Sequence, residues 1–176
     1  ARARELAHPF SLAYALTFGA LLACRQGDPA RARALADETL ALAGRHGYLL
    51  WQIGATLARG WAGAQQGDPE AVATIRQCVE ATRAAMGGVT LVVLEPLAEA
   101  CVLRGHHDEA LAVIDEALAL GAQLGDHHID AVLWHLRGQA LEARGASLAE
   151  SAACLARARD IASAQGAKGL MPRRSR

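Results

Sequence analysis

The 176-residue sequence is poor in aromatic side chains and lacks several patterns that mark enzymes or membrane proteins. Aromatic residues make up only 4% of the chain, and so few aromatic and β-branched residues argue against a β-sheet. No apolar run is long enough to span a membrane, and no GxxxxGK[ST] phosphate-binding loop occurs. Because 18 basic and 18 acidic residues cancel, we expect neither nucleic acid nor a membrane as a partner.

The cysteines indicate a reducing compartment. None of the four forms a CxxC pair, and they are far apart in the sequence (Cys24, Cys78, Cys101 and Cys154). This spacing favours a cytoplasmic protein over a disulfide-linked secreted one. We expect all four to lie inside helices as small hydrophobic residues rather than as nucleophiles. The chain begins Ala-Arg-Ala-Arg without an initiator methionine, which we interpret as a piece of a longer protein.

Two interleaved series of glycines indicate an internal repeat. The first series consists of Gly27, Gly67, Gly105 and Gly145, and the second of Gly47, Gly87, Gly125 and Gly166. Both series recur at nearly the same interval, with a period of roughly 40 positions. One turn inside each unit and one turn between units explains both series. We also expect Gly47, Gly125 and Gly166 of the second series to end helices in the left-handed conformation.

The apolar segments between these glycines predict eight helices in four antiparallel pairs, because alanine and leucine dominate them. The first helices are expected at 9–26, 48–66, 89–104 and 127–144. The second helices are expected at 29–45, 69–86, 108–124 and 148–165. We predict one helical repeat domain over 1–168, with repeats at 9–47, 48–88, 89–125 and 126–166. Residues 169–176 are expected to form a disordered tail.

Several inner turns carry residues that start helices. Asp28 and Asp68 are each followed by a proline, so the aspartate is predicted to cap the helix and Pro29 or Pro69 to occupy its first position. Asp108 is expected to cap the third inner turn. The fourth, from Ser147 to Glu150, has the sequence of a capping box.

Small residues and one proline complete the pattern. A small residue lies seven positions before each inner-turn glycine, where we expect helices to touch closely (Ala20, Gly60, Ala98 and Gly138). Pro96 falls inside an expected helix, so a kink or a late helix start is predicted there.

The fourth pair carries a recognisable motif. Trp134-x-x-Arg137-Gly138-x-x-Leu141 resembles the tetratricopeptide repeat signature, although the period of this chain is longer than that of the standard repeat. Other segments resemble the C-terminal repeat region of bacterial multidomain signalling ATPases and class III adenylate/guanylate cyclases. These segments are 8–16, 59–67 and 160–168. The resemblance implies a right-handed superhelical solenoid that serves as a regulatory tail, with any catalytic domain elsewhere.

Other side-chain groupings favour ordinary structural roles. The pairs His106-His107 and His127-His128 flank one helix, which holds them about 24 Å apart, so they cannot share a metal ion. Glu95 and Glu99 lie one helical turn apart, and we interpret them as solvated acidic surface or as part of a binding groove. We therefore predict no catalytic residue, no metal and no cofactor.

In a tetratricopeptide-like stack the first helices line a concave face. Counting from the small residues predicts a groove that is apolar or aromatic at one end and acidic at the other. Its predicted residues are Tyr14, Thr17, Leu21, Arg25, Leu57, Trp61, Gln65, Glu95, Glu99, His135, Gln139 and Glu142. Packing of Trp61 between neighbouring pairs is an equal alternative. Tyr14 and Trp61 are the expected apolar anchors, and the glutamates favour a basic partner.

These observations predict a non-catalytic scaffold that binds a protein or peptide segment, which includes another domain of its own parent chain. A second hypothesis is a domain that senses a small-molecule effector in the groove. A third is a self-association module, because exposed solenoid ends without polar caps can form homo-oligomers.

Overall fold

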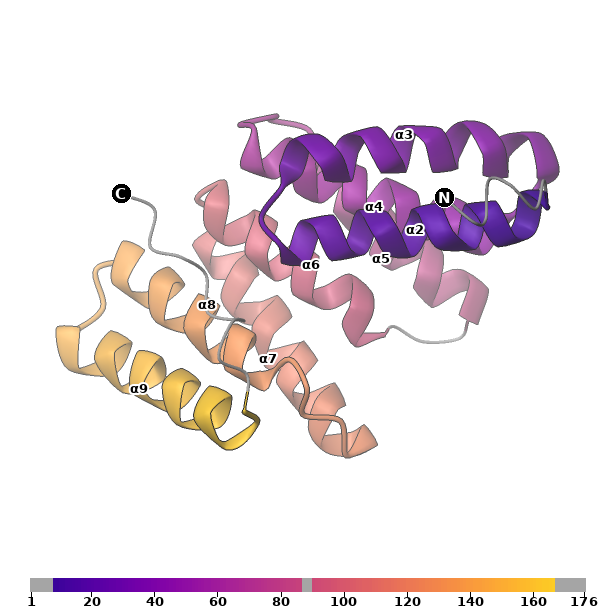
Figure 1. The fold of residues 1–176 in the computed structure, drawn as a ribbon. Coiled ribbons are helices and arrows are strands. Elements are labelled where there is room, and N and C mark those ends of the chain that lie inside the picture. Colours follow the sequence, from indigo (N-terminus) through magenta and orange to yellow (C-terminus); the bar gives the residue numbers. More distant parts are fainter. Residues whose placement is uncertain (1–7, 87–89, 167–176) are drawn as a thin grey trace. The chain divides into compact units, whose positions relative to one another are not determined.

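The computed structural model describes residues 8–86 and 90–166, and every regular element in these two ranges is an α-helix. The elements are α2 (Pro9–Arg25), α3 (Pro29–His46), α4 (Leu49–Gln65), α5 (Ala71–Met86), α6 (Leu91–Leu103), α7 (His107–Leu124), α8 (Asp130–Ala143) and α9 (Leu148–Ala164) (Figure 1). The predicted all-α class is confirmed, and the helix bounds agree closely with the prediction. The expected tail at 169–176 lies outside the described residues.

The chain divides into two compact units, Ala1–Gly88 and Val89–Arg176, and the boundary falls at a predicted repeat border. In the first unit, α4 packs on both α2 and α3, and α5 packs on α4. In the second unit, α8 packs in the same way on both α6 and α7, and α9 packs on α8. Each unit therefore consists of two helical hairpins, and the first helix of the second hairpin packs on both helices of the first hairpin.

The glycines of both series have left-handed backbone. Seven of the eight are described, with φ between 66° and 85°, and Gly87 lies outside the described residues. At Gly47, which ends α3, φ is 68° and the glycine N–H donates to Ala43 O. A side chain in this conformation is strained, so glycine permits the turn. The expectation for the second series is confirmed at Gly47, Gly125 and Gly166, and the first series shares the conformation.

Two of the predicted helix starts are confirmed. The Asp28 carboxylate accepts a hydrogen bond from Arg31 N at 3.0 Å, with Pro29 at the first position of α3. Ser147 and Glu150 form a complete capping box, in which each side chain accepts from the other's backbone N–H. A further cap was not predicted: His8 Nδ1 accepts from the backbone N–H of Ser11 at 3.3 Å, at the start of α2.

The other two predicted helix starts need correction. Asp68 accepts from Glu70 N at 3.0 Å, but this bond closes a turn over residues 68–70, and α5 begins only at Ala71. Pro69 is therefore in the turn rather than at the first helical position. The third inner turn is not capped by Asp108, since α7 begins one residue earlier. The Asp108 carboxylate lies in the first turn of α7 and pairs with Arg144 at 3.1 Å.

Pro96 lies inside α6, which continues through it from Leu91 to Leu103. The helix starts at Leu91 rather than at the expected position 89, and Pro96 lies in its second turn. Because proline has no N–H, the carbonyl one turn earlier loses its usual helical donor. The helix is thus not broken at Pro96, and its slightly later start leaves the proline inside it.

Close contacts form at the predicted small residues. Ala20 and Ala98 are fully buried. A Cβ on Gly60 would lie 2.6 Å from Ile75 Cγ1 of α5, and a Cβ on Gly138 would lie 2.8 Å from Leu155 Cγ of α9. Both helix pairs therefore approach so closely that only glycine fits without a shift.

The cysteines lie inside helices, as predicted, and none is in a disulfide: Cys24 is partly buried and the other three are buried. No helix in the described ranges combines the length and the apolar character needed to cross a bilayer.

Candidate functional site

Four of the predicted groove residues are core side chains rather than surface anchors. Their exposed fractions are small: Thr17 2%, Leu57 1%, Trp61 3% and Glu95 7%. Thr17, Leu57 and Glu95 each lie three positions before a small packing residue, and a step of three keeps a helical side chain on the same face. They therefore share the buried face of their helices, which corrects the prediction that they line an open groove.

Trp61 belongs to a cluster of small residues. Its ring packs with Ala23 of α2, Ala32 of α3 and Ala62 of its own helix. The alternative interpretation, in which Trp61 packs between neighbouring pairs, is the one that the structure supports. Its indole stabilises the contact between hairpins and is not presented to solvent.

Glu95 and His135 occupy equivalent repeat positions in the second unit, where Glu95 is buried and His135 is partly buried. Glu95 is buried in α6, so it is not part of a solvated acidic surface. Burial lowers the pKa of the His135 imidazole, because desolvation disfavours the charged ring. Glu99 is only partly exposed.

Leu21 is also partly buried, and the remaining predicted residues are exposed but fall into two groups. Tyr14, Arg25 and Gln65 lie in the first unit, whereas Gln139 and Glu142 lie in the second. Of these residues, Tyr14 contacts the aromatic rings around Trp51, which are described below.

A groove follows the α4–α5 hairpin in the first unit. Two neighbouring cavities of about 210 and 350 Å³ share Thr56 of α4 and Thr74 of α5 in their walls, and we call the two together the α4–α5 groove. None of the twelve predicted groove residues lines it. The first cavity is lined by Leu49, Gln52, Ile53, Thr56, Thr74, Gln77, Cys78 and Ala81.

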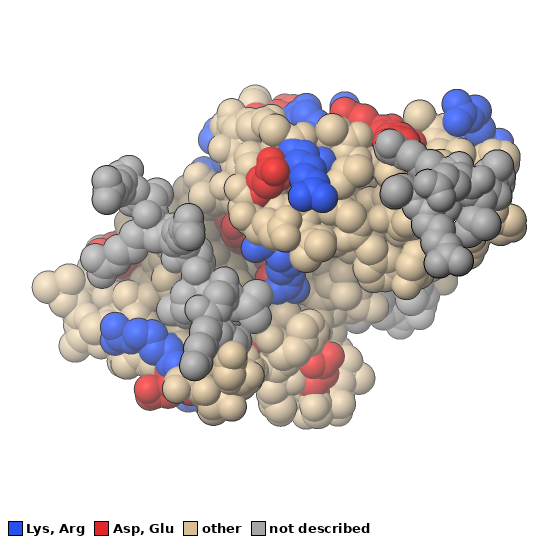
Figure 2. Space-filling model, in the orientation of Figure 1, with Lys and Arg blue, Asp and Glu red and all other residues tan. Residues whose placement is uncertain are grey.

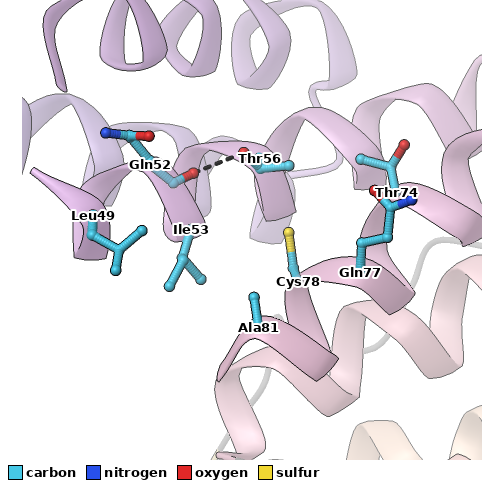
Figure 3. Close-up of a pocket in the computed structure, with 8 residues that line it drawn as sticks. All are labelled: Leu49, Gln52, Ile53, Thr56, Thr74, Gln77, Cys78 and Ala81. Carbon is cyan, nitrogen blue, oxygen red and sulfur yellow. Dashed lines mark hydrogen bonds between the residues drawn. The ribbon is translucent and has the colours of Figure 1, made fainter. Parts of the chain in front are cut away.

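The first cavity is apolar with amide groups at its edges. Figure 3 shows Leu49 and Ile53 on the side of α4 that faces α5, and the Cys78 thiol directed towards α4. Thr56 donates its hydroxyl to Gln52 O at 2.8 Å, so its methyl group is left to the cavity wall. The Gln52 amide donates to Ala43 O at 3.2 Å, which holds that side chain against the end of α3.

Cys78 lies in the wall of this cavity, but its thiol is not an activated nucleophile. Burial raises the pKa of the Cys78 thiol to about 11. At neutral pH the group is therefore a neutral thiol, whereas nucleophilic cysteines are thiolates stabilised by a nearby positive charge.

The second cavity is charged. It is lined by Arg33, Thr56, Arg59, Gly60, Asp68, Glu70, Ala71 and Thr74. Arg59 pairs with Asp37 at 3.5 Å. The Nε of Arg33 is buried and has no hydrogen-bond partner among the described residues. This end of the groove can therefore recognise charged groups, while the other end suits an apolar side chain.

A second surface of the first unit is aromatic. Four large apolar side chains follow each other at every fourth position along α2 and are about half exposed: Phe10 46%, Tyr14 49%, Phe18 51% and Leu22 54%. We call these four residues the α2 stripe. A spacing of four places them on one face of the helix.

Trp51 of α4 lies beneath the α2 stripe. Its ring meets Phe10 and Tyr14 edge to face, both at 5.4 Å between centroids, and Phe18 at 6.5 Å. Such contacts order the exposed rings. The Trp51 Nε1 is buried without a hydrogen-bond partner among the described residues. Apolar contact rather than hydrogen bonding therefore holds this cluster.

Sequence reasoning missed most of both surfaces. It selected Tyr14 but not the other three residues of the α2 stripe, although their regular spacing is visible in the sequence. The groove residues Gln52, Thr56, Thr74 and Gln77 carry no comparable signal, because isolated polar residues on helices are usually solvated.

The second unit contains two histidine–aspartate pairs in the turn before α8. His127 Nδ1 lies 2.9 Å from Asp130 Oδ2, and His128 Nδ1 lies 2.6 Å from Asp126 Oδ1. Hydrogen bonds from the His128 side chain and backbone lower the pKa of Asp126. Within the part of the chain that the structure describes, no three His, Cys, Asp or Glu side chains converge as a metal site would require.

Comparison with family models, with curated proteins and with solved structures found no match to this chain.

Proposed function

We propose that this chain is a non-catalytic binding module that holds a peptide segment of a protein partner in the α4–α5 groove. We further propose that its hairpins stack as a right-handed, tetratricopeptide-like solenoid, and that it is the regulatory repeat region of a larger cytoplasmic bacterial signalling protein. The resemblance of Trp134-x-x-Arg137-Gly138-x-x-Leu141 to the repeat signature supports the second proposal. The hairpin-on-hairpin packing inside each unit is compatible with it.

The observation that carries the binding proposal is that the two cavities are neighbours on one hairpin. Thr56 and Thr74 line both cavities, so an apolar cavity and a charged cavity lie side by side in a single unit. A peptide can place an apolar side chain between Leu49, Ile53 and Ala81 and charged side chains beside Arg33 and Glu70.

The side chains of the groove suit binding better than covalent chemistry. Thr74 and Gln77 offer a hydroxyl and an amide to the backbone groups of an extended segment, while the Thr56 hydroxyl and the Gln52 amide already donate to backbone carbonyls of this chain. The one thiol, Cys78, has a pKa of about 11, which supports a structural role for it. Binding without chemistry is therefore the function that these residues favour.

The test uses peptides selected on the protein itself. A random dodecapeptide library displayed on phage is panned against the immobilised chain, and the affinity of enriched peptides is then measured by fluorescence anisotropy. We expect Ala81→Trp, which fills the apolar end, to weaken binding by about tenfold or more. Gln77→Ala should weaken it less. Both positions are exposed, so neither change removes a core contact.

Matched controls exist in the second unit. Ala122 and Gln123 of α7 are also exposed and lie outside both cavities. Ala122→Trp and Gln123→Ala should leave the affinity unchanged. If no peptide is enriched, or if enriched peptides bind Ala81→Trp as tightly as the original chain, the groove proposal is wrong.

A further inference from the structure

The α2 stripe is a contiguous apolar area on the surface of the first unit. Half of each aromatic side chain and of Leu22 is exposed, which amounts to roughly 400 Å² of apolar surface over the four residues. This is within the range of the largest patches on monomeric proteins, which are often functional. In the described residues, α2 packs only on α3 and α4, and neither helix covers the stripe.

The repeat register places three of the four stripe residues on a docking face, whereas the equivalent of Phe10 is Leu50, which is 58% exposed. Moving one repeat along the chain takes Tyr14 to Gly54, Phe18 to Ala58 and Leu22 to Ala62. Ala58 and Ala62 are buried in clusters with residues of α2 and α3. A Cβ on Gly54 would lie 2.7 Å from the Thr17 methyl group. The face of α4 that contacts the preceding hairpin is thus the face that α2 leaves open.

The size of the residues excludes a simple repetition of that contact. The internal contact uses glycine and alanine, which let the helices approach closely, whereas α2 carries tyrosine, phenylalanine and leucine at the same positions. If another hairpin packed on α2 in the way that the α2–α3 hairpin packs on α4, it would overlap with these rings. The occupant must instead offer large side chains that fit between them.

The charge of the surface favours a second copy of the same chain. From Pro9 to Cys24, α2 contains no Asp, Glu, Lys or Arg, and the surface over the middle of α2 is uncharged in Figure 2. A surface without charge does not repel its own copy, whereas it gives no charge complementarity to a basic or acidic partner.

We infer that two copies of this chain associate weakly through their α2 stripes, with the two α2 helices antiparallel. The four residues are spaced evenly about position 16, so an antiparallel pair places Phe10 opposite Leu22 of the second copy and Tyr14 opposite Phe18 of the second copy. A parallel pair would bring the two Arg25 side chains together, which costs energy through like-charge repulsion. This inference concerns a different surface from the groove and does not depend on it.

The expected association is concentration-dependent. About 400 Å² from each copy is roughly half of what each partner contributes to a stable interface of standard size. The chain should therefore sediment near its single-chain mass of 18.5 kDa at about 5 µM and approach twice that mass at several hundred µM. If the chain keeps its single-chain mass over this whole range, the inference is wrong and the stripe binds a different partner.

Substitutions test which surface is used and in which orientation. Phe18→Glu and Tyr14→Lys should each keep the chain monomeric over the full range. Val92→Glu, at a residue that is 54% exposed on α6, is the control and should associate like the unmodified chain. Thermal unfolding of each variant confirms that it is folded.

An equimolar mixture of the two stripe variants decides the orientation. In an antiparallel pair, Lys at 14 meets Glu at 18 of the other copy, and the second contact remains Phe18 with Tyr14. Mixed dimers should therefore form where neither variant alone dimerises. If the mixture stays monomeric, or if Phe18→Glu dimerises like the unmodified chain, the antiparallel stripe contact is wrong.

Discussion

Trp61→Ala should lower the stability of the first unit by several kcal/mol instead of acting only on binding. The side chain is 3% exposed and packs against three alanines. Cutting the indole back to a methyl group removes roughly 150 Å² of buried surface, and at about 25 cal/mol/Å² this corresponds to about 4 kcal/mol. Alanine neighbours have no rotamers with which to fill the space. The cavity therefore persists and keeps the loss within about 3–5 kcal/mol.

Urea denaturation followed by far-ultraviolet circular dichroism measures this loss. With a slope of about 2 kcal/mol per M urea, the midpoint of the affected transition should fall by roughly 2 M. Trp134→Ala is the matched control. Trp134 is partly exposed, and its ring contacts the guanidinium groups of Arg137 at 5.6 Å and Arg157 at 4.2 Å. Its loss should be smaller, at about 1–2 kcal/mol.

The two variants together can refute the packing argument. If Trp61→Ala shifts the midpoint by less than about 0.3 M, the indole is not part of a close-packed core. The interpretation of Trp61 as an exposed binding anchor, which the structure disfavours, would then be the better one.

Three further predictions follow from local geometry. Gly138→Ala should destabilise by about 1–3 kcal/mol, because its Cβ would overlap a side chain of α9, whereas Gly44→Ala, with nothing within 4 Å, should stabilise by about 0.5–1 kcal/mol in urea titrations. Ser147→Ala should cost about 1 kcal/mol at neutral pH. Hydrogen bonds from the Ser147 side chain and backbone lower the pKa of Glu150, so the part of the cap that involves the Glu150 carboxylate is present at neutral pH and is lost as pH falls through that pKa. Thermal unfolding should therefore show the difference shrinking in acid, and a constant difference would contradict this cause. With a pKa of about 11, the Cys78 thiol should be about 0.1% thiolate at pH 8, and mass spectrometry should show it alkylated far more slowly than in urea-unfolded chain.

The fold was predictable because its signals are local. Left-handed glycines such as Gly47 and Gly125 end helices for steric reasons that do not depend on tertiary contacts. The Ser147–Glu150 box likewise forms within one turn. The errors occur where the local options are nearly equal: Asp68 can cap a helix or close a turn with its carboxylate, and here it closes the turn.

The site was less predictable because burial depends on the neighbours of a residue as well as on its place in the repeat. Leu21, Trp61, Glu99 and Gln139 occupy one equivalent position in the four successive repeats. Trp61 is buried, Leu21 and Glu99 are partly buried and Gln139 is exposed. No count along a single helix distinguishes these outcomes, since each depends on what packs against that helix.

The surroundings of Trp61 show how the neighbours decide. Ala23 and Ala32 come from the two helices of the preceding hairpin, and their exposed fractions are at most 1%. Because both are small, the hairpins leave a space of the size of an indole, which Trp61 fills. If either alanine were enlarged, the indole would lose its place, so the tryptophan and the alanines specify one contact together. Ala32→Leu should therefore destabilise the original chain by about 1–3 kcal/mol but should partly restore the stability of Trp61→Ala by filling its cavity. A double-mutant cycle in urea measures this coupling, and strictly additive losses would show that these side chains do not share one packed space.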